Sequence, residues 1–137
     1  MSLADSLENA ALDAMLGSSA TLLGGSLEVA LSTTTPNDDG TNFTEPSGYG
    51  YARVPVTNND ANWPAASGGE KKNANTITFP TASGGSWGTV THWGILDGGN
   101  VKIFGIIDDG AGGAAPRTIL DGDQFLFLAN QLRITMD

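Results

Sequence analysis

The pattern of apolar and polar positions predicts one N-terminal helix followed by short β-strands. Near the start of the chain, apolar side chains recur at three- and four-residue steps, the spacing of one helical face. This stripe consists of Leu3, Leu7, Ala10, Ala11 and Ala14. Ser2 is a suitable N-cap for a helix over about residues 3–16, and Gly17 is a suitable stop. The stripe either packs on the chain's own sheet or docks on a neighbouring subunit, and the sequence leaves both interpretations open.

Beyond Gly25 the apolar period changes to two, which is typical of strands with one buried face. Leu27, Val29 and Leu31 show it first, and apolar patterns predict further strands over residues 49–57, 76–80, 87–96 and 101–107, with alternation continuing to the C-terminus. Pro55 restricts its strand to a sheet edge because proline donates no backbone hydrogen bond. Residues 97–100, with the letters DGGN, predict a hairpin turn. Residues 101–107 are apolar on both faces, so we expect that strand to be central.

These elements predict a mainly β fold. About seven or eight short strands separated by turns favour a single β-sandwich, jelly-roll or immunoglobulin-like, with one N-terminal helix. A chain of 137 residues is long enough to bury one core. We therefore expect residues 1–17 to form the helix, a packing or docking element, and residues 18–137 to form the sandwich.

Charge and composition exclude several classes of partner. The net charge is −9 and the six basic residues are scattered, so neither nucleic acid nor an anionic membrane surface is an expected partner. No stretch approaches the ~18 consecutive apolar residues of a membrane span. The chain has no cysteine, which excludes disulfides and thiolate metal sites. Its N-terminus lacks the basic region of a secretory signal, so synthesis in the cytosol is expected.

The residues offer little catalytic chemistry. His92 is the one histidine, which excludes a multi-histidine metal site within the chain. No phosphate-binding loop occurs, and no nucleophile elbow. We expect no catalytic residue, no cofactor and no metal, and therefore no enzyme. The oxygen-rich loop from Asn37 to Asn42 is either a self-bonded turn or a weak cation site.

Aromatic residues in or beside polar loops are the candidate interface anchors. Phe43, Tyr49, Tyr51 and Trp63 lie in such segments, and aromatics are enriched at protein interfaces. Core filling is the alternative for each of them. Together with Leu3 and Leu7 they form the predicted interface set. A carbohydrate-binding sandwich, with Trp63 and Tyr51 as stacking platforms, is a further hypothesis.

Six segments together resemble a known family. They are LENAALD (7–13), LEVALST (27–33), EPSGYGYARV (45–54), ITFP (77–80), WGTVTHWGI (87–95) and DGDQF (121–125). In this order they are similar to small tailed-bacteriophage proteins commonly described as phage tail fibre proteins. The resemblance implies a virion structural protein without catalytic residues, made in the cytoplasm of the host bacterium.

The resemblance leaves the location on the virion open. Long fibres have repeated shafts, and no internal repeat occurs here. A compact sandwich favours a capsid decoration (cement) protein bound to the outer surface of the head, and a tail fibre or tail-tip adaptor is the alternative. The expected partners are other virion proteins, either the major capsid protein or tail proteins. Closed symmetry at such seams favours a homo-oligomer, with a trimer as one option.

Overall fold

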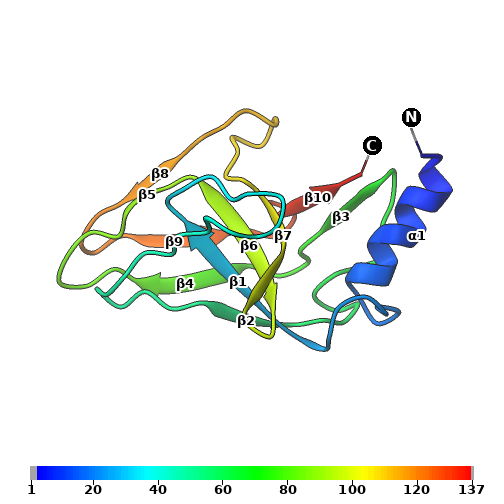
Figure 1. Ribbon diagram of the computed structural model, residues 1–137, viewed down its shortest axis with the longest axis horizontal. Coiled ribbons are helices and arrows are strands. Elements are labelled where there is room, and N and C mark those ends of the chain that lie inside the picture. Colours follow the sequence, from blue (N-terminus) through cyan, green and yellow to red (C-terminus); the bar gives the residue numbers. More distant parts are fainter. Residues whose placement is uncertain (1–2, 137) are drawn as a thin grey trace. The chain divides into compact units, whose positions relative to one another are not determined.

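The computed structural model describes residues 3–136 and is mainly β, as the sequence predicts (Figure 1). Its helix is α1 (Asp5–Met15). The strands are β1 (Ser26–Ser32), β2 (Val54–Thr57), β3 (Glu70–Lys72), β4 (Ile77–Thr81), β5 (Gly88–Val90), β6 (His92–Asp97), β7 (Asn100–Ile106), β8 (Arg117–Ile119), β9 (Gln124–Phe127) and β10 (Arg133–Thr135). Within residues 3–136, no helical stretch has the length and hydropathy that crossing a bilayer requires.

The strands form several small sheets, consistent with the expected sandwich-like architecture. One sheet has four strands in the order β2-β1-β6-β7, and the other pairs are β10-β3, β4-β9 and β5-β8. The strands pair antiparallel in β6 with β7, in β5 with β8 and in β10 with β3. In Figure 1, β6 and β7 run side by side and are joined by a tight hairpin.

Local patterns predicted several of these strands correctly. In β1, Leu27, Val29 and Leu31 are buried as predicted, but Ala30 and Ser32 on the other face are buried too, so the prediction of a strand with one buried face is wrong for this part of β1. In β4, Ile77 and Phe79 are buried. The turn at residues 97–100 joins β6 to β7 as predicted. The strand that contains Pro55 is at an edge of the four-stranded sheet, again as predicted.

Four predictions about strands are wrong or incomplete. Residues 101–107 do not form a central strand, because β7 is the other edge of its sheet. The segment 87–96 contains two strands, β5 and β6, which pair with different partners. The segment 49–57 is strand only from Val54. The strand β3 was not predicted, since its residues Glu-Lys-Lys have no apolar alternation and become a strand by pairing with β10.

The helix begins and ends close to the predicted positions. Ala4 is the N-cap and makes no side-chain cap hydrogen bond, while the predicted cap Ser2 lies outside the described residues. After Met15, Leu16 is extended and Gly17 has a φ of 109°, which a glycine adopts without steric cost. Buried Asn58 fixes this end, because its Nδ2 donates to the Met15 carbonyl at 3.1 Å and its Oδ1 accepts from the Gly17 N–H at 2.7 Å.

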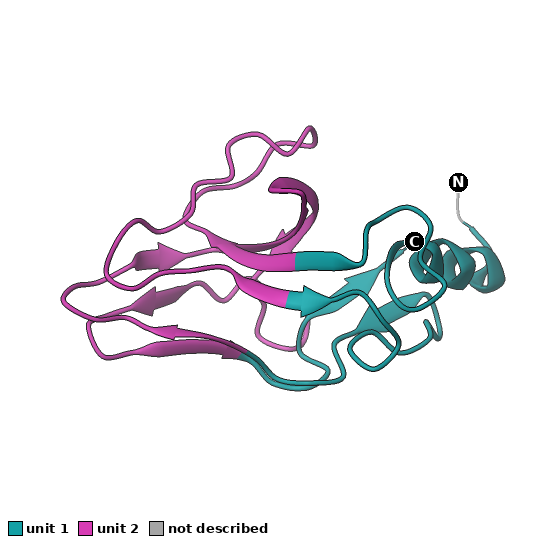
Figure 2. Ribbon diagram, turned by 90° about the horizontal axis from the view of Figure 1, so that it is seen from below, with its two compact units in different colours: residues 1–27, 56–77, 127–137 teal, residues 28–55, 78–126 magenta. Residues whose placement is uncertain are grey.

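The chain forms two compact units, coloured separately in Figure 2. Unit 1 contains residues 1–27, 56–77 and 127–137, and unit 2 contains residues 28–55 and 78–126. Unit 1 therefore combines the helix with β3 and β10, whereas β5, β6, β7 and β8 belong to unit 2. Whether residues 1–17 and 18–137 behave as separate folding elements stays a prediction.

Candidate binding surface

Three turns of unit 2 are joined into one cluster, which we call the tip. The tip consists of the turns Gly48–Gly50, Ala82–Trp87 and Leu120–Asp123. Three backbone hydrogen bonds, each from N–H to carbonyl oxygen, connect them: Ser83 to Tyr49 at 3.0 Å, Ala82 to Asp123 at 2.9 Å, and Gly122 to Ala82 at 2.8 Å. Since each turn bonds to the next, the backbones of the three turns are held together.

The first turn of the tip has an uncommon backbone that presents Tyr49. Gly48, Tyr49 and Gly50 all have positive φ, of 75°, 53° and 80°. Glycine adopts this region freely, but a tyrosine there is strained and needs support from its surroundings. The support comes from the Tyr49 carbonyl, which accepts hydrogen bonds from the Ser83 N–H and from the Trp87 indole Nε1, both at 3.0 Å.

The second turn supplies a flat support for the Tyr49 ring. A Cβ added at Gly85 would lie 2.5 Å from Cε1 of this ring, and one added at Gly84 would lie 3.8 Å from Cδ1. At Gly85 only a glycine leaves room for the ring, whereas a Cβ at Gly84 would make ordinary van der Waals contact with it. The side chain of Tyr49 is nevertheless 50% exposed. The tip therefore presents a half-exposed aromatic ring that rests on Gly85.

The third turn adds an exposed apolar side chain and an acid. Leu120 is 56% exposed, and its N–H donates to Asp123 Oδ2 at 2.9 Å. Asp121 Oδ1 accepts from the Gly84 N–H at 2.9 Å. An aromatic ring and an aliphatic side chain beside polar turns form the kind of mixed surface that binding loops use.

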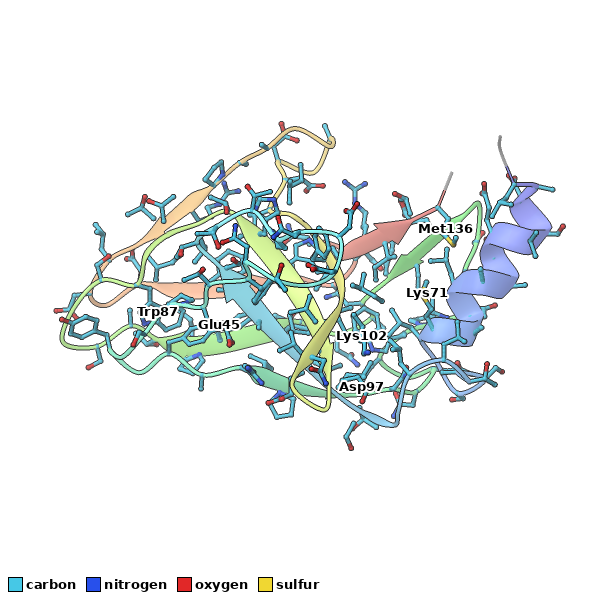
Figure 3. The ribbon with its side chains drawn as sticks, in the orientation of Figure 1. Glu45, Lys71, Trp87, Asp97, Lys102 and Met136 are labelled. Atoms are coloured by element: carbon cyan, nitrogen blue, oxygen red, sulfur yellow. The ribbon has the colours of Figure 1, made fainter. Side chains whose placement is uncertain are left out.

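A partly exposed network supports the segment that leads into and out of the first turn. The Arg53 guanidinium holds Glu45 with two hydrogen bonds, Nε to Oε1 at 3.0 Å and Nη2 to Oε2 at 2.9 Å. Arg53 Nη1 also lies 3.3 Å from Glu28 Oε1 on β1. Such a bidentate pair fixes geometry as well as charge. Figure 3 shows Glu45 and Trp87 on neighbouring segments of this unit.

Tyr51 belongs to this internal network and is not a surface anchor. Its hydroxyl donates to Glu45 Oε1 at 2.9 Å and accepts from the Leu31 N–H at 3.0 Å. Its ring lies edge-on to Trp87 at 5.2 Å and stacks on Phe79 at 6.4 Å between centroids. Burial, followed by the neighbouring Glu45 charge, raises the pKa of Tyr51 well above its ordinary value despite the hydrogen bond from Leu31. The residue stays a neutral hydroxyl in its structural position.

The predicted interface residues are divided between surface and core. Tyr49 and Leu7 are exposed, Leu7 to 55%, while Leu3, Phe43 and Tyr51 are half-buried. The Phe43 ring covers Gly94 of β6, where an added Cβ would meet its Cε2 at 2.7 Å. Trp63 is fully buried in unit 1, so in this conformation it contacts no second protein and stacks on no sugar. The structure brings only Tyr49 of this set to the tip.

Sequence reasoning missed Leu120 and the glycine support of the tip. Leu120 stands directly before an Asp-Gly-Asp turn, and an apolar residue at a turn is a signal of exposure that could have been used. The contact between Gly84–Gly85 and Tyr49 joins positions more than thirty residues apart in the sequence, so no local sequence pattern predicts it.

The remaining predicted sites have local explanations. Asp39 Oδ1 accepts from the Thr41 hydroxyl at 2.6 Å and from the Thr41 N–H at 3.0 Å, and these bonds lower the pKa of Asp39. This is self-bonded turn chemistry. His92 Nδ1 lies 2.8 Å from Thr91 Oγ1, and burial lowers the pKa of His92. Across residues 3–136, no group of three acidic or histidine side chains is placed to hold a metal ion.

Comparison with known families gives one match over nearly the whole chain. The family model described as "Podophage GP4 fiber I protein gp80" matches residues 2–135. No curated protein matches the chain.

Proposed function

Because this chain belongs to the podophage GP4 fiber I protein gp80 family, we propose that it is a tail fibre or tail-tip component whose unit 2 tip contacts the surface of the host cell. Membership makes it a structural component of a bacteriophage virion. The match favours the tail-fibre alternative over the capsid decoration that the sequence analysis preferred. The observation that supports contact with the host surface is the exposed ring of Tyr49, which rests on Gly85.

The proposed contact is binding without catalysis. Among the described residues, Tyr49 is the aromatic side chain with a largely exposed ring, and the acids beside it are engaged in turns. An exposed tyrosine offers a large rigid contact area at small conformational-entropy cost. A sugar bound at the tip would stack on Tyr49, and not on Trp63 or Tyr51 as the hypothesis of a carbohydrate-binding sandwich assumed. The lone imidazole of His92 has no assigned role in this proposal.

The first test truncates the exposed ring. Tyr49→Ala is expected to weaken binding of the purified protein to host cell envelopes by about 30-fold, the effect of losing a ~2 kcal/mol anchor. Binding is measured by sedimentation of labelled protein with envelopes. Gly85→Ala is expected to act in the same direction, because its Cβ would displace the ring.

The matched control removes an apolar side chain of unit 2 outside the tip turns. Leu126 is 37% exposed and lies in β9, so Leu126→Ala should leave envelope binding within about twofold of the unchanged protein. Full envelope binding by Tyr49→Ala would show that the tip is not the surface that contacts the host cell. Equal losses in Tyr49→Ala and Leu126→Ala would also contradict it, since the effect would then not be specific to the tip.

The second test locates the protein on the virion. Electron cryomicroscopy of particles carrying a tagged copy is expected to show density at the tail, and the number of copies at each site measures the oligomeric state, including the expected homo-oligomer or trimer. Density distributed over the head would overturn the tail proposal and restore the decoration hypothesis.

A further inference from the structure

The helix α1 turns its polar side chains toward the body of unit 1. Asp13 Oδ1 accepts from Lys71 Nζ at 2.7 Å and from the Ala66 N–H at 2.8 Å. Asn9 Oδ1 accepts from the Gly69 N–H at 2.8 Å, and Glu8 is only 6% exposed. Leu12 is fully buried between these groups. Lys71 belongs to β3, and Figure 3 labels it on the side of β3 that faces α1.

The opposite face of the same helix is apolar and outward. Leu7 is 55% exposed, Ala10 is exposed, and Leu3 and Ala14 are half-buried. Their spacing of four, three and four residues places them on one stripe. Leu22, 67% exposed, lies at the end of the helix because its N–H donates to the Ala14 carbonyl at 2.9 Å. We call Leu7, Ala10, Ala14 and Leu22 the outer stripe.

This arrangement differs from that of an ordinary surface helix, because α1 buries Leu12 but leaves a second apolar stripe exposed. A helix on a globular body usually buries its apolar stripe and exposes its charges. Here two of the three acids of α1 are buried or paired inside, while the two most exposed leucines of unit 1 lie on or beside the outer stripe. The sequence left open whether the helix packs on its own body or docks elsewhere. In the structure, one face of α1 packs on unit 1 and the opposite face is exposed and free for docking.

Charge and size indicate what covers the outer stripe. Acids lie at both ends of the helix: Asp5 is exposed in its first turn, and Asp60 Oδ1 accepts from the Ser18 N–H just after its end at 2.8 Å. The helix contains no basic residue, so the same helix of a second copy would supply no cation to pair with these acids. A pair of eleven-residue helices also buries less than the ~1,200 Å² of a stable interface.

We infer that the outer stripe of α1 docks in an apolar groove with a lysine- and arginine-rich rim on a different virion protein. This inference rests on the proposed virion role and names the surface by which the protein is attached. The binding mode is a helix laid into a groove, with Leu7 and Leu22 as anchors and Ala10 and Ala14 allowing close approach. The rim cations pair with Asp5 and Asp60 at the ends of the helix.

The test measures incorporation into particles. The double variant Leu7→Asp with Leu22→Asp is expected to lower the amount of protein per virion at least about tenfold, measured by quantitative mass spectrometry against the capsid protein. Both side chains are exposed, so the helical circular dichroism and the melting temperature of the purified variant should stay unchanged. Leu128→Asp is the matched control, since Leu128 is a 51% exposed leucine of the same unit, and it should incorporate normally.

A separate variant tests the proposed pairing between the acids of the helix and the basic rim of the groove. Asp5→Lys should lower incorporation several-fold, and high salt should weaken binding of the unchanged protein to particles that lack it. Improved incorporation of Asp5→Lys would overturn the basic rim. If the purified protein is an oligomer that the double leucine variant dissociates, the occupant is a second copy and the inference is wrong.

The design separates this inference from the proposed function. Full incorporation of the folded double variant overturns the docking surface while leaving the virion role intact. Absence of the unchanged protein from purified particles overturns the proposed function itself. Tyr49→Ala should incorporate normally, because the tip and the outer stripe have different partners.

Discussion

Replacing Trp63 with alanine is expected to lower the free energy of unfolding by about 3–5 kcal/mol, the largest effect of any single apolar truncation in unit 1. Trp63 is fully buried and is the bulkiest wholly buried side chain of the described residues. Its removal leaves a cavity in addition to the lost burial of the ring. The loss is measured by urea unfolding of the purified protein.

Trp63→Phe is the matched variant and should be far milder. No residue among 3–136 accepts a hydrogen bond from the buried Trp63 Nε1, so phenylalanine loses ring volume but no hydrogen bond. We expect a cost of less than about 1.5 kcal/mol. Equal costs for Trp63→Ala and Trp63→Phe would contradict the structure, because they would mean that the indole N–H makes an essential bond.

Replacing Asp13 with alanine is expected to lower the free energy of unfolding by about 3 kcal/mol. Lys71 is 1% exposed and its ammonium group pairs with Asp13 Oδ1 at 2.7 Å, so the variant leaves a buried positive charge without this partner. The expected cost is at the lower end of the range for buried pairs because the Asp13 side chain is 36% exposed and water screens it.

Lys71→Met is the control for Asp13→Ala. It removes the buried charge, keeps a side chain of similar length, and leaves a carboxylate that water can solvate. We expect a cost below about 1 kcal/mol for Lys71→Met, and the double variant should be more stable than Asp13→Ala alone. If Asp13→Ala itself costs less than about 1 kcal/mol, Lys71 reaches water by another route and its burial is wrong.

The Asp13–Lys71 pair also predicts a pH dependence. Burial raises the pKa of Asp13, but the hydrogen bonds from Lys71 and Ala66 and the Lys71 charge outweigh it and hold the pKa below the ordinary value of 3.8. A lowered folded-state pKa contributes stability above 3.8 that is lost as the pH falls through the folded-state value. The stability difference between the unchanged protein and Asp13→Ala should therefore shrink below about pH 4.

The local sequence pattern was sufficient to predict strands with alternating apolar side chains and turns that contain glycine. The burial of Leu27, Val29 and Leu31 follows from period two, and the hairpin at 97–100 follows from its glycines. The existence of α1 and its end at Gly17 were predictable for the same reason. Each of these properties depends on neighbours within a few residues along the chain.

Which tyrosine or tryptophan would be exposed could not be predicted locally. Trp63 and Tyr49 both lie in polar loops, yet Trp63 is fully buried and Tyr49 is half exposed. The difference comes from contacts distant in sequence, since Tyr49 rests on Gly84 and Gly85. The rule that aromatic residues in loops are interface anchors therefore identifies candidates but does not separate exposed ones from buried ones.

The sequence alone determined that this chain is a mainly β protein with one helix, and that its segments match a phage fibre family. Tertiary structure decided that β7 is an edge, that Lys71 is buried against Asp13, and that α1 buries Glu8 and Leu12 while it leaves Leu7 exposed. The physical reason is that periodicity shows which residues share a face, whereas the direction of that face depends on what the rest of the chain packs against it.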